Sequence, residues 1–226
     1  MGTHIRRLFE RCRSVGHHPK PFKEAEVVMI AKPGRRDLTS PQAWRPVSLP
    51  SCFGKGLEKL IARRLTWAGV HYSVLYPQQA GALPKGSAVD LVAALIHDIE
   101  EAFARKKVAT LVTMDFQGAF DTLMRNRLVL RLREQGWPNH LARWAEPFMK
   151  DRSARVRYQD SLNPFAPLHC AAPQGSPLPI LFLLYTELIY RLGNPQGRFG
   201  YVDDTSILSI GDTVEESTAM ACSSIN

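Results

Sequence analysis

The spacing of hydrophobic and polar residues predicts several amphipathic helices. Apolar residues recur at helical intervals from Gly56 to Ala68. A second stripe is expected to face the core, and it consists of Val92, Leu95, Ile96, Ile99 and Phe103. Further helices are predicted over Arg6–Arg13, Thr122–Gln135, from Pro138 onward, over Pro177–Leu192 and from Asp212 onward, where Asp212-Thr213-Val214-Glu215 has the spacing of a capping box.

Short segments of β-branched residues predict the strands. Val108–Met114 is apolar and nearly uncharged, so we expect a central strand that is buried on both faces and ends at Asp115. Arg198–Tyr201 and Thr205–Ile210 predict a hairpin joined across Val202-Asp203-Asp204. Other extended segments are predicted at Val27–Ala31, Pro41–Leu49 and Arg155–Gln159. Because helices and strands do not alternate regularly, the expected class is α+β.

Composition narrows the functional classes. The 226 residues include 29 Lys and Arg against 21 Asp and Glu, a formal charge of +8, which weakly favours polyanionic partners. Four widely spaced cysteines form no CxxC pair, which argues against a zinc module or a disulfide framework. The longest apolar stretch, Pro177–Tyr185, is too short to span a bilayer. We therefore expect a soluble intracellular protein that needs no membrane.

Three carboxylates are candidates for a functional site. Asp115 follows an apolar strand, and Asp203-Asp204 occupies the expected bend of a hairpin. Each alone is typical of an ordinary turn. Together, adjacent carboxylates repel each other unless a cation or a proton neutralises them. Two Mg²⁺ ions would turn such a cluster into a site for in-line phosphoryl transfer, and hard cations suit an all-oxygen ligand set.

Ordered motifs give the chain a family resemblance. Val112–Asp121, Pro173–Leu178 and Tyr201-Val202-Asp203-Asp204 resemble, in this order, three palm motifs of reverse transcriptases from LINE-type (non-LTR) retrotransposons. Upstream, Arg45–Leu49 and Gln79-Ala80-Gly81 are similar to finger motifs of that family. The resemblance implies a right-hand polymerase with fingers and an antiparallel palm sheet packed on helices. Its implied division is an N-terminal helical segment (1–20), a fingers-like part (21–107) and a partial palm (108–226), without a thumb.

The resemblance also implies roles for individual residues. Asp115, Asp203 and Asp204 would be catalytic and would hold two Mg²⁺ ions, or Mn²⁺, with the Phe116 carbonyl as a further ligand. The implied nucleotide-binding residues are Lys32, Arg45, Phe120 and Gln174. Phe120 would exclude a ribose 2′-OH; the alternative for this residue is core packing, and the two roles are compatible. The implied template and primer contacts are Arg35, Arg36, Gly175 and Tyr201.

The sequence departs from the family pattern in three ways. One residue is missing after Leu178, and in a helix this rotates the following residues by about 100°. Val202 stands where alanine is common in these elements. The chain also stops soon after the third motif. The missing residue and the early stop lead us to expect an incomplete or decayed copy with impaired activity.

The expected function is RNA-directed DNA synthesis, with an RNA template, a DNA primer and deoxynucleoside triphosphates as partners. The alternative is a non-catalytic nucleic-acid-binding remnant of a retrotransposon polymerase. An RNA-synthesising palm enzyme is disfavoured because those enzymes typically carry Gly-Asp-Asp. The family implies a nuclear or cytoplasmic location, and the sequence leaves the oligomeric state open.

Overall fold

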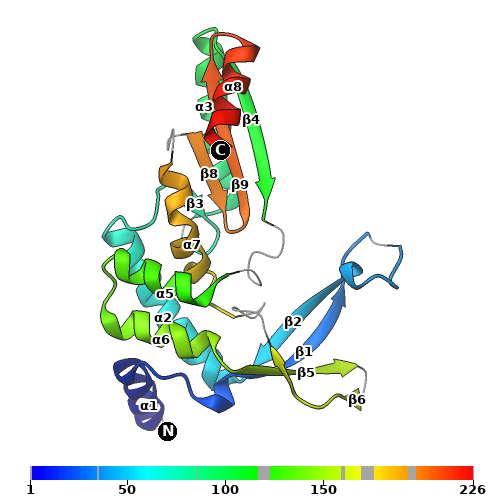
Figure 1. Cartoon of the computed structure of the whole chain (residues 1–226), viewed down its shortest axis with the longest axis vertical. Helices are drawn as coiled ribbons and strands as arrows, with labels where there is room; N and C mark the ends of the chain where they lie inside the picture. Colours follow the sequence, from blue (N-terminus) through cyan, green and yellow to red (C-terminus); the bar gives the residue numbers. More distant parts are fainter. Residues whose placement is uncertain are drawn as a thin grey trace. The chain divides into compact units, whose positions relative to one another are not determined.

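The chain divides into two compact units. The computed structural model describes residues 2–34, 36–84, 86–116, 123–158, 161–168, 176–192 and 197–225, apart from the side chains of Gln42 and Ile225. Unit 1 comprises residues 1–64 and 120–178, and unit 2 comprises residues 65–119 and 179–226 (Figure 1). Mixed helices and strands confirm the α+β class. No helix in the described ranges combines the length and apolarity of a membrane span.

Unit 1 contains a twisted sheet and a group of helices. Its helices are α1 (Gly2–Val15), η1 (Lys20–Phe22), η2 (Pro41–Ala43), the first part of α2 (Cys52–His71), α5 (Arg125–Glu134) and α6 (Asn139–Met149). Its strands are β1 (Glu24–Ala31), β2 (Trp44–Pro50), β5 (Arg152–Tyr158), β6 (Ser161–Leu162) and β7 (Ala166–Leu168). The strand order is β2-β1-β5-β6, with β7 also paired to β5. β1 runs antiparallel to β2 and parallel to β5.

The core of unit 1 is built from the apolar faces of three helices. Its most deeply buried side chains are Leu57, Ile61, Leu128, Leu132, Trp144 and Phe148. The helix predicted from Pro138 onward is confirmed by α6, whose buried residues include Leu141, Trp144 and Phe148. Gly136 follows the end of α5, where its φ of 77° is accessible to glycine at little cost.

The first long helix begins earlier than the sequence pattern predicts. α2 starts at Cys52 rather than Gly56, because the Ser51 hydroxyl accepts a hydrogen bond from the Gly54 amide at 3.0 Å and caps the first turn. Gly54 also lets Phe22 approach, since a Cβ there would lie 3.1 Å from the Phe22 Cβ. Two glycines among the first five residues of α2 concealed this start from a prediction based on helix propensity.

Unit 2 is a four-stranded sheet with helices on both faces. Its strands are β3 (Gln79–Ala80), β4 (Val108–Asp115), β8 (Arg198–Tyr201) and β9 (Asp204–Gly211). Its helices are α3 (Ala88–Ala104), α7 (Ile180–Thr186), η3 (Glu187–Arg191), α8 (Val214–Ile225) and the end of α2. The strand order is β3-β8-β9-β4; β3 and β8 are parallel, and the other pairs are antiparallel.

Helices α8 and α3 cover opposite faces of this sheet (Figure 1). The Thr110 and Ser217 hydroxyls lie 2.7 Å apart, which joins β4 to α8 on one face. On the other face, Leu91 and Leu95 of α3 line a hollow of about 240 Å³ together with Phe199, Tyr201, Asp204 and Ser206. Since successive residues of a strand point to opposite faces, Asp204 lies on the α3 side.

The expectation that Val108–Met114 is a central strand buried on both faces is wrong. In the described part of the chain β4 pairs only with β9, and Leu111 remains 42% exposed. Residues of β4 alternate between half-buried and exposed from Thr110 to Asp115. One face packs beneath α8, whereas α3 covers only part of the other. A run of apolar residues does not distinguish these two situations.

The predicted core stripe of the second long helix is confirmed only in part, at Leu95 and Ile99, which are half-buried. Val92, Ile96 and Phe103 are 51%, 48% and 60% exposed. The helix also turns Leu91 toward the sheet of unit 2, and Ala102 is almost completely buried. The packed face is thus shifted by about one residue, or roughly 100°. Small and apolar residues on both sides of the helix left its rotation undetermined by sequence.

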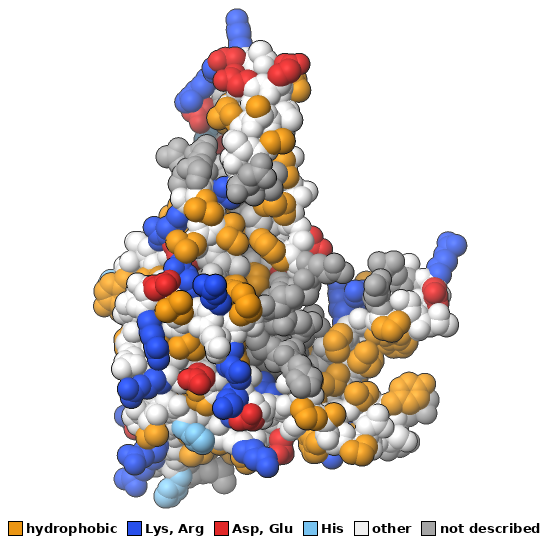
Figure 2. Space-filling view, in the orientation of Figure 1, with side chains coloured by type: hydrophobic (Ala, Val, Ile, Leu, Met, Phe, Trp, Pro, Cys, Tyr) orange, Lys and Arg blue, Asp and Glu red, His pale blue; other side chains and the backbone are white. Residues whose placement is uncertain are grey.

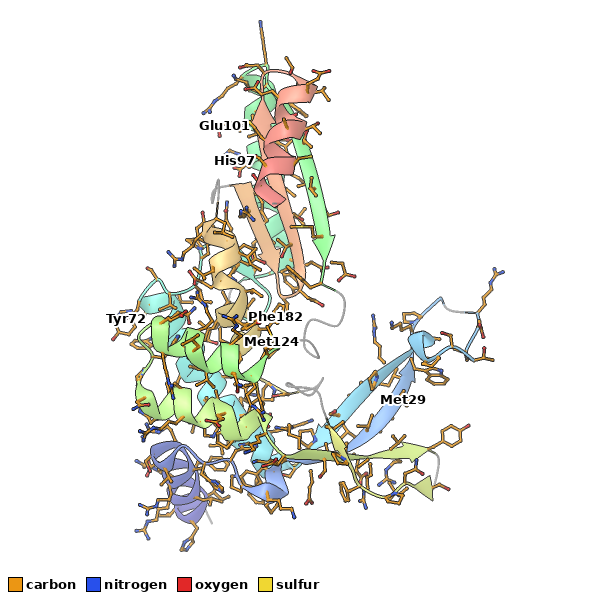
Figure 3. The ribbon with its side chains drawn as sticks, in the orientation of Figure 1. Met29, Tyr72, His97, Glu101, Met124 and Phe182 are labelled. Atoms are coloured by element: carbon orange, nitrogen blue, oxygen red, sulfur yellow. The ribbon has the colours of Figure 1, made fainter. Side chains whose placement is uncertain are left out.

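Two further helices, α7 and α8, have boundaries that differ from the predictions. The apolar segment after Leu178 is not one long helix: α7 ends at Thr186 and continues as the 3-10 helix η3. Phe182, labelled in Figure 3, is one of six buried residues among the seven of α7. Because α7 is apolar on all sides, a one-residue slip before it would not turn a polar face into the core.

The cap of α8 lies one residue later than predicted. The Thr213 hydroxyl, rather than Asp212, accepts a hydrogen bond from the Glu216 amide at 3.2 Å. The Glu216 carboxylate in turn accepts a hydrogen bond from the Asp212 amide at 2.7 Å. Asp212 pairs instead with Lys107, which directly precedes β4. Two overlapping capping-box patterns, beginning at Asp212 and Thr213, made the sequence ambiguous here.

His18 gives unit 1 a pH-dependent stability. Its ring is completely buried among Phe22, Trp144 and Phe148, and burial, reinforced by the nearby Arg152 charge, lowers its pKa to about 3. Below about pH 6.5 the unfolded chain binds a proton that the folded chain refuses, so folding loses free energy as the pH falls toward 3. Lowering the pH to 5 should cost about 2 kcal/mol, at about 1.4 kcal/mol per pH unit.

We predict that His18→Gln weakens this pH dependence. Denaturant unfolding at pH 7 and pH 5 should show a larger loss of unfolding free energy in the wild-type protein than in the variant. Burial shifts the neighbouring Glu58 pKa upward, which acts in the opposite sense and is present in both proteins. Identical losses in the two proteins would contradict the assignment.

Candidate functional site

The three predicted carboxylates lie on neighbouring strands of unit 2. β8 and β9 form a hairpin in which Tyr201 is the register partner of Asp204, leaving Val202 and Asp203 as the turn. β4 pairs with the other side of β9, and its last residue, Asp115, is the register partner of Asp204. Residues opposite each other in antiparallel strands have Cα atoms about 4.5–5.5 Å apart. The sheet therefore brings together residues that are 88 positions apart in the chain.

The environment of these carboxylates is open and polar. Asp115 and Asp204 are exposed and Asp203 is half-buried. Register partners point to the same face of a sheet, so Asp115 and Asp204 share the side that carries α3. Like charges placed directly opposite each other destabilise a sheet unless a cation compensates them. The arrangement is therefore costly for a purely structural turn.

The short strand β3 supports the turn from the side. β3 runs parallel to β8, and the Val202 amide donates to the Ala80 carbonyl at 3.2 Å while the Gly200 amide donates to the Gln78 carbonyl at 3.0 Å. The Gln79 side chain is buried, accepts from the Tyr76 amide at 3.1 Å and donates to the Leu183 carbonyl of α7 at 3.2 Å. This motif, which the resemblance assigns to the fingers, thus fixes the backbone that leads to Asp203.

The turn itself has an unusual backbone. Val202 has a φ of 57°, a left-handed conformation that β-branched residues rarely adopt. Gly81 faces it with a φ of 104°, and a Cβ at Gly81 would lie only 2.4 Å from the Val202 Cγ2. Only glycine allows this close approach. The conformation therefore depends on contacts between β3 and the turn, which offset its strain.

A second close approach joins Gly200 of the β8–β9 hairpin to Tyr190. A Cβ at Gly200 would lie 2.1 Å from the Tyr190 hydroxyl, so a larger residue there would displace the tyrosine. The Tyr190 and Thr205 hydroxyls are 2.8 Å apart, and burial raises the pKa of Tyr190. Sequence reasoning did not identify Tyr190 or Gly200 as supports of the site. The available signal was a glycine directly before the Tyr-Val-Asp-Asp motif.

The three carboxylates suit a hard divalent cation, but the described side chains do not form a complete coordination site. Among the described residues, no group of three or more His, Cys, Asp or Glu side chains is arranged as a metal site. Asp115 and Asp204 nevertheless supply opposed carboxylates, and Asp203 adds one from the adjacent turn. Carboxylate oxygens match the preference of Mg²⁺ and Mn²⁺. Phe116, whose carbonyl is the further predicted ligand, directly follows β4 and is half-buried.

The predicted basic residues lie on the β1–β2 hairpin of unit 1. Arg45 in β2 is the register partner of Ile30, and the Lys32 amide extends the pairing with a 2.8 Å bond to the Ala43 carbonyl. Lys32 is two residues beyond Ile30, so strand alternation places it on the same face as Arg45. Arg36 is exposed in the connecting loop. The hairpin thus gathers positive charge at one end of the sheet.

Apolar side chains accompany this charge along the hairpin. Figure 2 shows exposed hydrophobic side chains over β1 and β2, and Met29, labelled in Figure 3, is 38% exposed. Ile30 and Leu49 are 51% and 46% exposed. Arg35, Phe120, Gln174 and Gly175, to which the resemblance gives further contacts, lie outside the described residues.

Comparison with known proteins independently supports the resemblance to reverse transcriptases that the motifs indicate. The family described as "Reverse transcriptase (RNA-dependent DNA polymerase)" matches residues 30–223. A probable RNA-directed DNA polymerase from transposon BS of Drosophila melanogaster is 30% identical over 209 residues, which cover 89% of this chain and 23% of that protein. The polymerase from mobile element jockey of the same fly is 27% identical, over 80% of this chain and 20% of the relative.

A third relative and a solved structure agree with these matches. The Pol polyprotein of the type-1 retrotransposable element R2 of Popillia japonica is 28% identical, over 85% of this chain and 27% of that protein. The chain thus spans about a quarter of the length of these curated relatives. An apo telomerase structure from Candida tropicalis, truncated from its C-terminal domain, matches 92% of this chain and 47% of its own with a TM-score of 0.58. At 13% identity it supports the fold alone.

The strained turn makes a testable prediction about stability. Val202→Asn should raise the unfolding free energy by about 1 kcal/mol, because asparagine tolerates positive φ better than a β-branched residue. Denaturant unfolding measures the change. Val156→Asn, at a half-exposed position of β5 with no positive φ, is the control and should bring no gain. Destabilisation by Val202→Asn would show that the valine side-chain contacts outweigh the backbone strain.

Proposed function

The chain belongs to the reverse transcriptase family, and from this premise we propose that it carries the fingers and catalytic palm of an RNA-directed DNA polymerase. The observation that supports the proposal most strongly is the register between β4 and β9, which sets Asp115 opposite Asp204 and beside the turn that holds Asp203. Its proposed substrates are deoxynucleoside triphosphates, an RNA template and a DNA primer. The division into residues 1–20, 21–107 and 108–226 remains a prediction.

Reverse transcriptases generally use divalent metal ions, and we assign their binding to Asp115, Asp203 and Asp204, with the Phe116 carbonyl as a further ligand. Bound Mg²⁺ ions would stabilise negative charge on the attacking and leaving oxygens of a phosphoryl transfer. The protein supplies the positions of the carboxylates. β3 and Gly81 hold the Val202 turn, and Tyr190 supports the hairpin from the opposite face.

The remaining assignments concern substrates. Lys32 and Arg45 are proposed to bind the triphosphate, because positioned cations neutralise anionic oxygens. Arg35 and Arg36 are proposed to contact phosphate or template, and Tyr201 the primer. Phe120 is proposed to exclude ribonucleotides, and Gln174 and Gly175 to lie along the nucleotide and template strand. These roles rest on the motif resemblance.

The carboxylate assignment predicts a loss of metal-dependent function. Asp115→Asn and Asp203→Asn should each reduce Mg²⁺-dependent primer extension at least a hundredfold, because each removes a charged metal ligand. The assay uses a homopolymeric RNA template with a DNA primer and is repeated with Mn²⁺. Asp98→Asn in α3 is a charge-matched control and should retain activity.

The alternative, a non-catalytic nucleic-acid-binding protein, predicts another pattern. The formal charge of +8 favours salt-sensitive binding to nucleic acid in either case. If primer-template binding is retained but neither extension nor dNTP binding depends on Asp115 and Asp203, the polymerase assignment fails for this chain.

The hairpin assignment predicts a specific defect in triphosphate binding. Lys32→Ala should weaken Mg²⁺-dependent dNTP binding about tenfold and leave primer-template affinity nearly unchanged, because it removes a cation from the triphosphate site. Titration with a fluorescent dNTP and with labelled primer-template measures the two affinities. Lys59→Ala, at an exposed position of α2, is the matched control. An equal loss of both affinities would place Lys32 on the nucleic acid instead.

A further inference from the structure

A pocket between α1 and α2 has no part in the function proposed so far. Its volume is about 480 Å³, and all of its lining residues belong to unit 1. Six residues of α1, spaced at helical intervals, form one wall, and Leu60 and Arg64 of α2 form the other. The volume falls within the range of roughly 300–1,000 Å³ that is typical of ligand sites.

Part of the pocket lining is apolar. Ile5 and Phe9 lie one turn apart on α1, and Leu60 belongs to α2. All three side chains are half-buried, so the two helices leave some of this apolar surface accessible. Phe9 reaches α2 at Gly56, where a Cβ would lie 3.2 Å from the Phe9 Cζ. The pocket therefore offers an apolar floor between two helices that are in direct contact.

Arginines accompany this apolar floor. Arg6, Arg13 and Arg64 line the pocket, and Glu10 is the carboxylate among the lining residues. Glu10 accepts a hydrogen bond from Arg6 at 2.9 Å, so these two charges compensate each other within α1. The charges of Arg13 and Arg64 are not compensated by any other lining residue. Figure 2 shows Lys and Arg side chains gathered over this end of unit 1.

A third helix brings a polar group to the same arginines. The Nε2 of His140, in α6, lies 3.2 Å from the Arg13 guanidinium. Burial lowers the pKa of His140, and the charges of Arg13 and Arg64 lower it further. A neutral imidazole accepts a hydrogen bond from Arg13 through this atom, which helps to orient the guanidinium. Helices α1, α2 and α6 thus bring their basic side chains together beside the apolar floor.

We propose that this pocket binds an acidic segment of a partner protein, in which apolar side chains are flanked by Asp or Glu. An apolar side chain of the segment lies against Ile5, Phe9 and Leu60, and its carboxylates pair with Arg13 and Arg64. The planar fork of a guanidinium matches a carboxylate with two parallel hydrogen bonds. An apolar anchor in a groove between helices, with charged groups around it, is a recurring mode of peptide recognition.

The apolar floor favours a peptide over a nucleic acid. A phosphate backbone binds along a line of cations and has no group that fills an aliphatic pocket. A base would need the open face of an aromatic ring. Ile5 and Leu60 are aliphatic, and the ring of Phe9 meets α2 at Gly56. The proposed ligand is thus distinct from the template, primer and nucleotide of the proposed function.

The test measures the binding of a fluorescein-labelled amphipathic peptide that carries two leucines one helical turn apart, flanked by Asp and Glu. Fluorescence anisotropy with the full chain should show saturable binding that weakens about tenfold in Arg13→Glu and in Arg64→Glu, because each reverses a charge beside the floor. Arg127→Glu, at an exposed position of α5 outside the pocket, is the charge-matched control and should bind normally. Retained affinity in Arg13→Glu and Arg64→Glu would overturn the inference.

A second arm separates the pocket from a general attraction between opposite charges. The same peptide with serines in place of its leucines should bind the wild-type chain about tenfold more weakly, because the apolar contact is lost. Ile5→Ser should weaken binding of the original peptide to a similar extent, with a melting temperature measured to show that the variant is folded. The serine peptide decides the question even if Ile5→Ser unfolds. Equal binding of the two peptides would overturn the inference.

Other occupants of the pocket give different patterns. Arg13→Glu could weaken the binding of a single-stranded RNA while the leucine and serine peptides bind alike; the pocket would then be part of a nucleic-acid surface, and the inference fails. It also fails if light scattering shows that the wild-type chain self-associates, binds no peptide, and becomes monomeric on Arg13→Glu. A chain that binds the peptide but no dNTP refutes the proposed polymerase site and leaves the peptide pocket supported.

Discussion

The pairing register of β4 with β9 is the constraint on which the candidate site depends. It sets Asp115 opposite Asp204, and the two-residue turn then leaves Asp203 beside them. A slip of one residue would send every side chain of β4 to the other face and separate the carboxylates. On the face covered by α8, the hydrogen bond between the Thr110 and Ser217 hydroxyls stabilises the position of β4. At the far end, Lys107 pairs with Asp212.

Contacts with neighbouring backbone stabilise the strained turn at Val202. Val202 adopts positive φ next to Gly81, and the Gln78 and Ala80 carbonyls accept hydrogen bonds from the Gly200 and Val202 amides. Gln79 joins the same strand to α7 through its buried side chain. Three segments distant in sequence therefore determine one turn. Such over-determination is typical of functional sites, where strained conformations persist because their surroundings leave no alternative.

Sequence reasoning identified the elements of the site better than their packing. The strand ending at Asp115 and the hairpin around Asp203 follow directly from β-branched runs and from the ordered motifs. The rotation of α3 did not follow, because Leu91, Val92, Leu95 and Ile96 offer apolar surface in two directions. The exposed face of β4 was missed for the same reason, since a uniform apolar run carries no alternation.

The supports of the site were the hardest features to predict. Tyr190 and Gly200 meet only in the folded sheet, and the Gln79 side chain donates to the Leu183 carbonyl, 104 positions away in the chain. No local pattern encodes such contacts. The motif resemblance, by contrast, assigned Arg35, Phe120, Gln174 and Gly175 from sequence alone, and these lie outside the residues that the structure describes.

The central claim is that the β4–β9 register forms a divalent metal site. The most direct measurement is anomalous diffraction from crystals of the chain soaked with Mn²⁺ and a dNTP. The account predicts Mn²⁺ peaks bound by the carboxylates of Asp115 and Asp203, with paired ions about 3.5–4 Å apart. Ordered Mn²⁺ elsewhere, with none at these carboxylates, would contradict it.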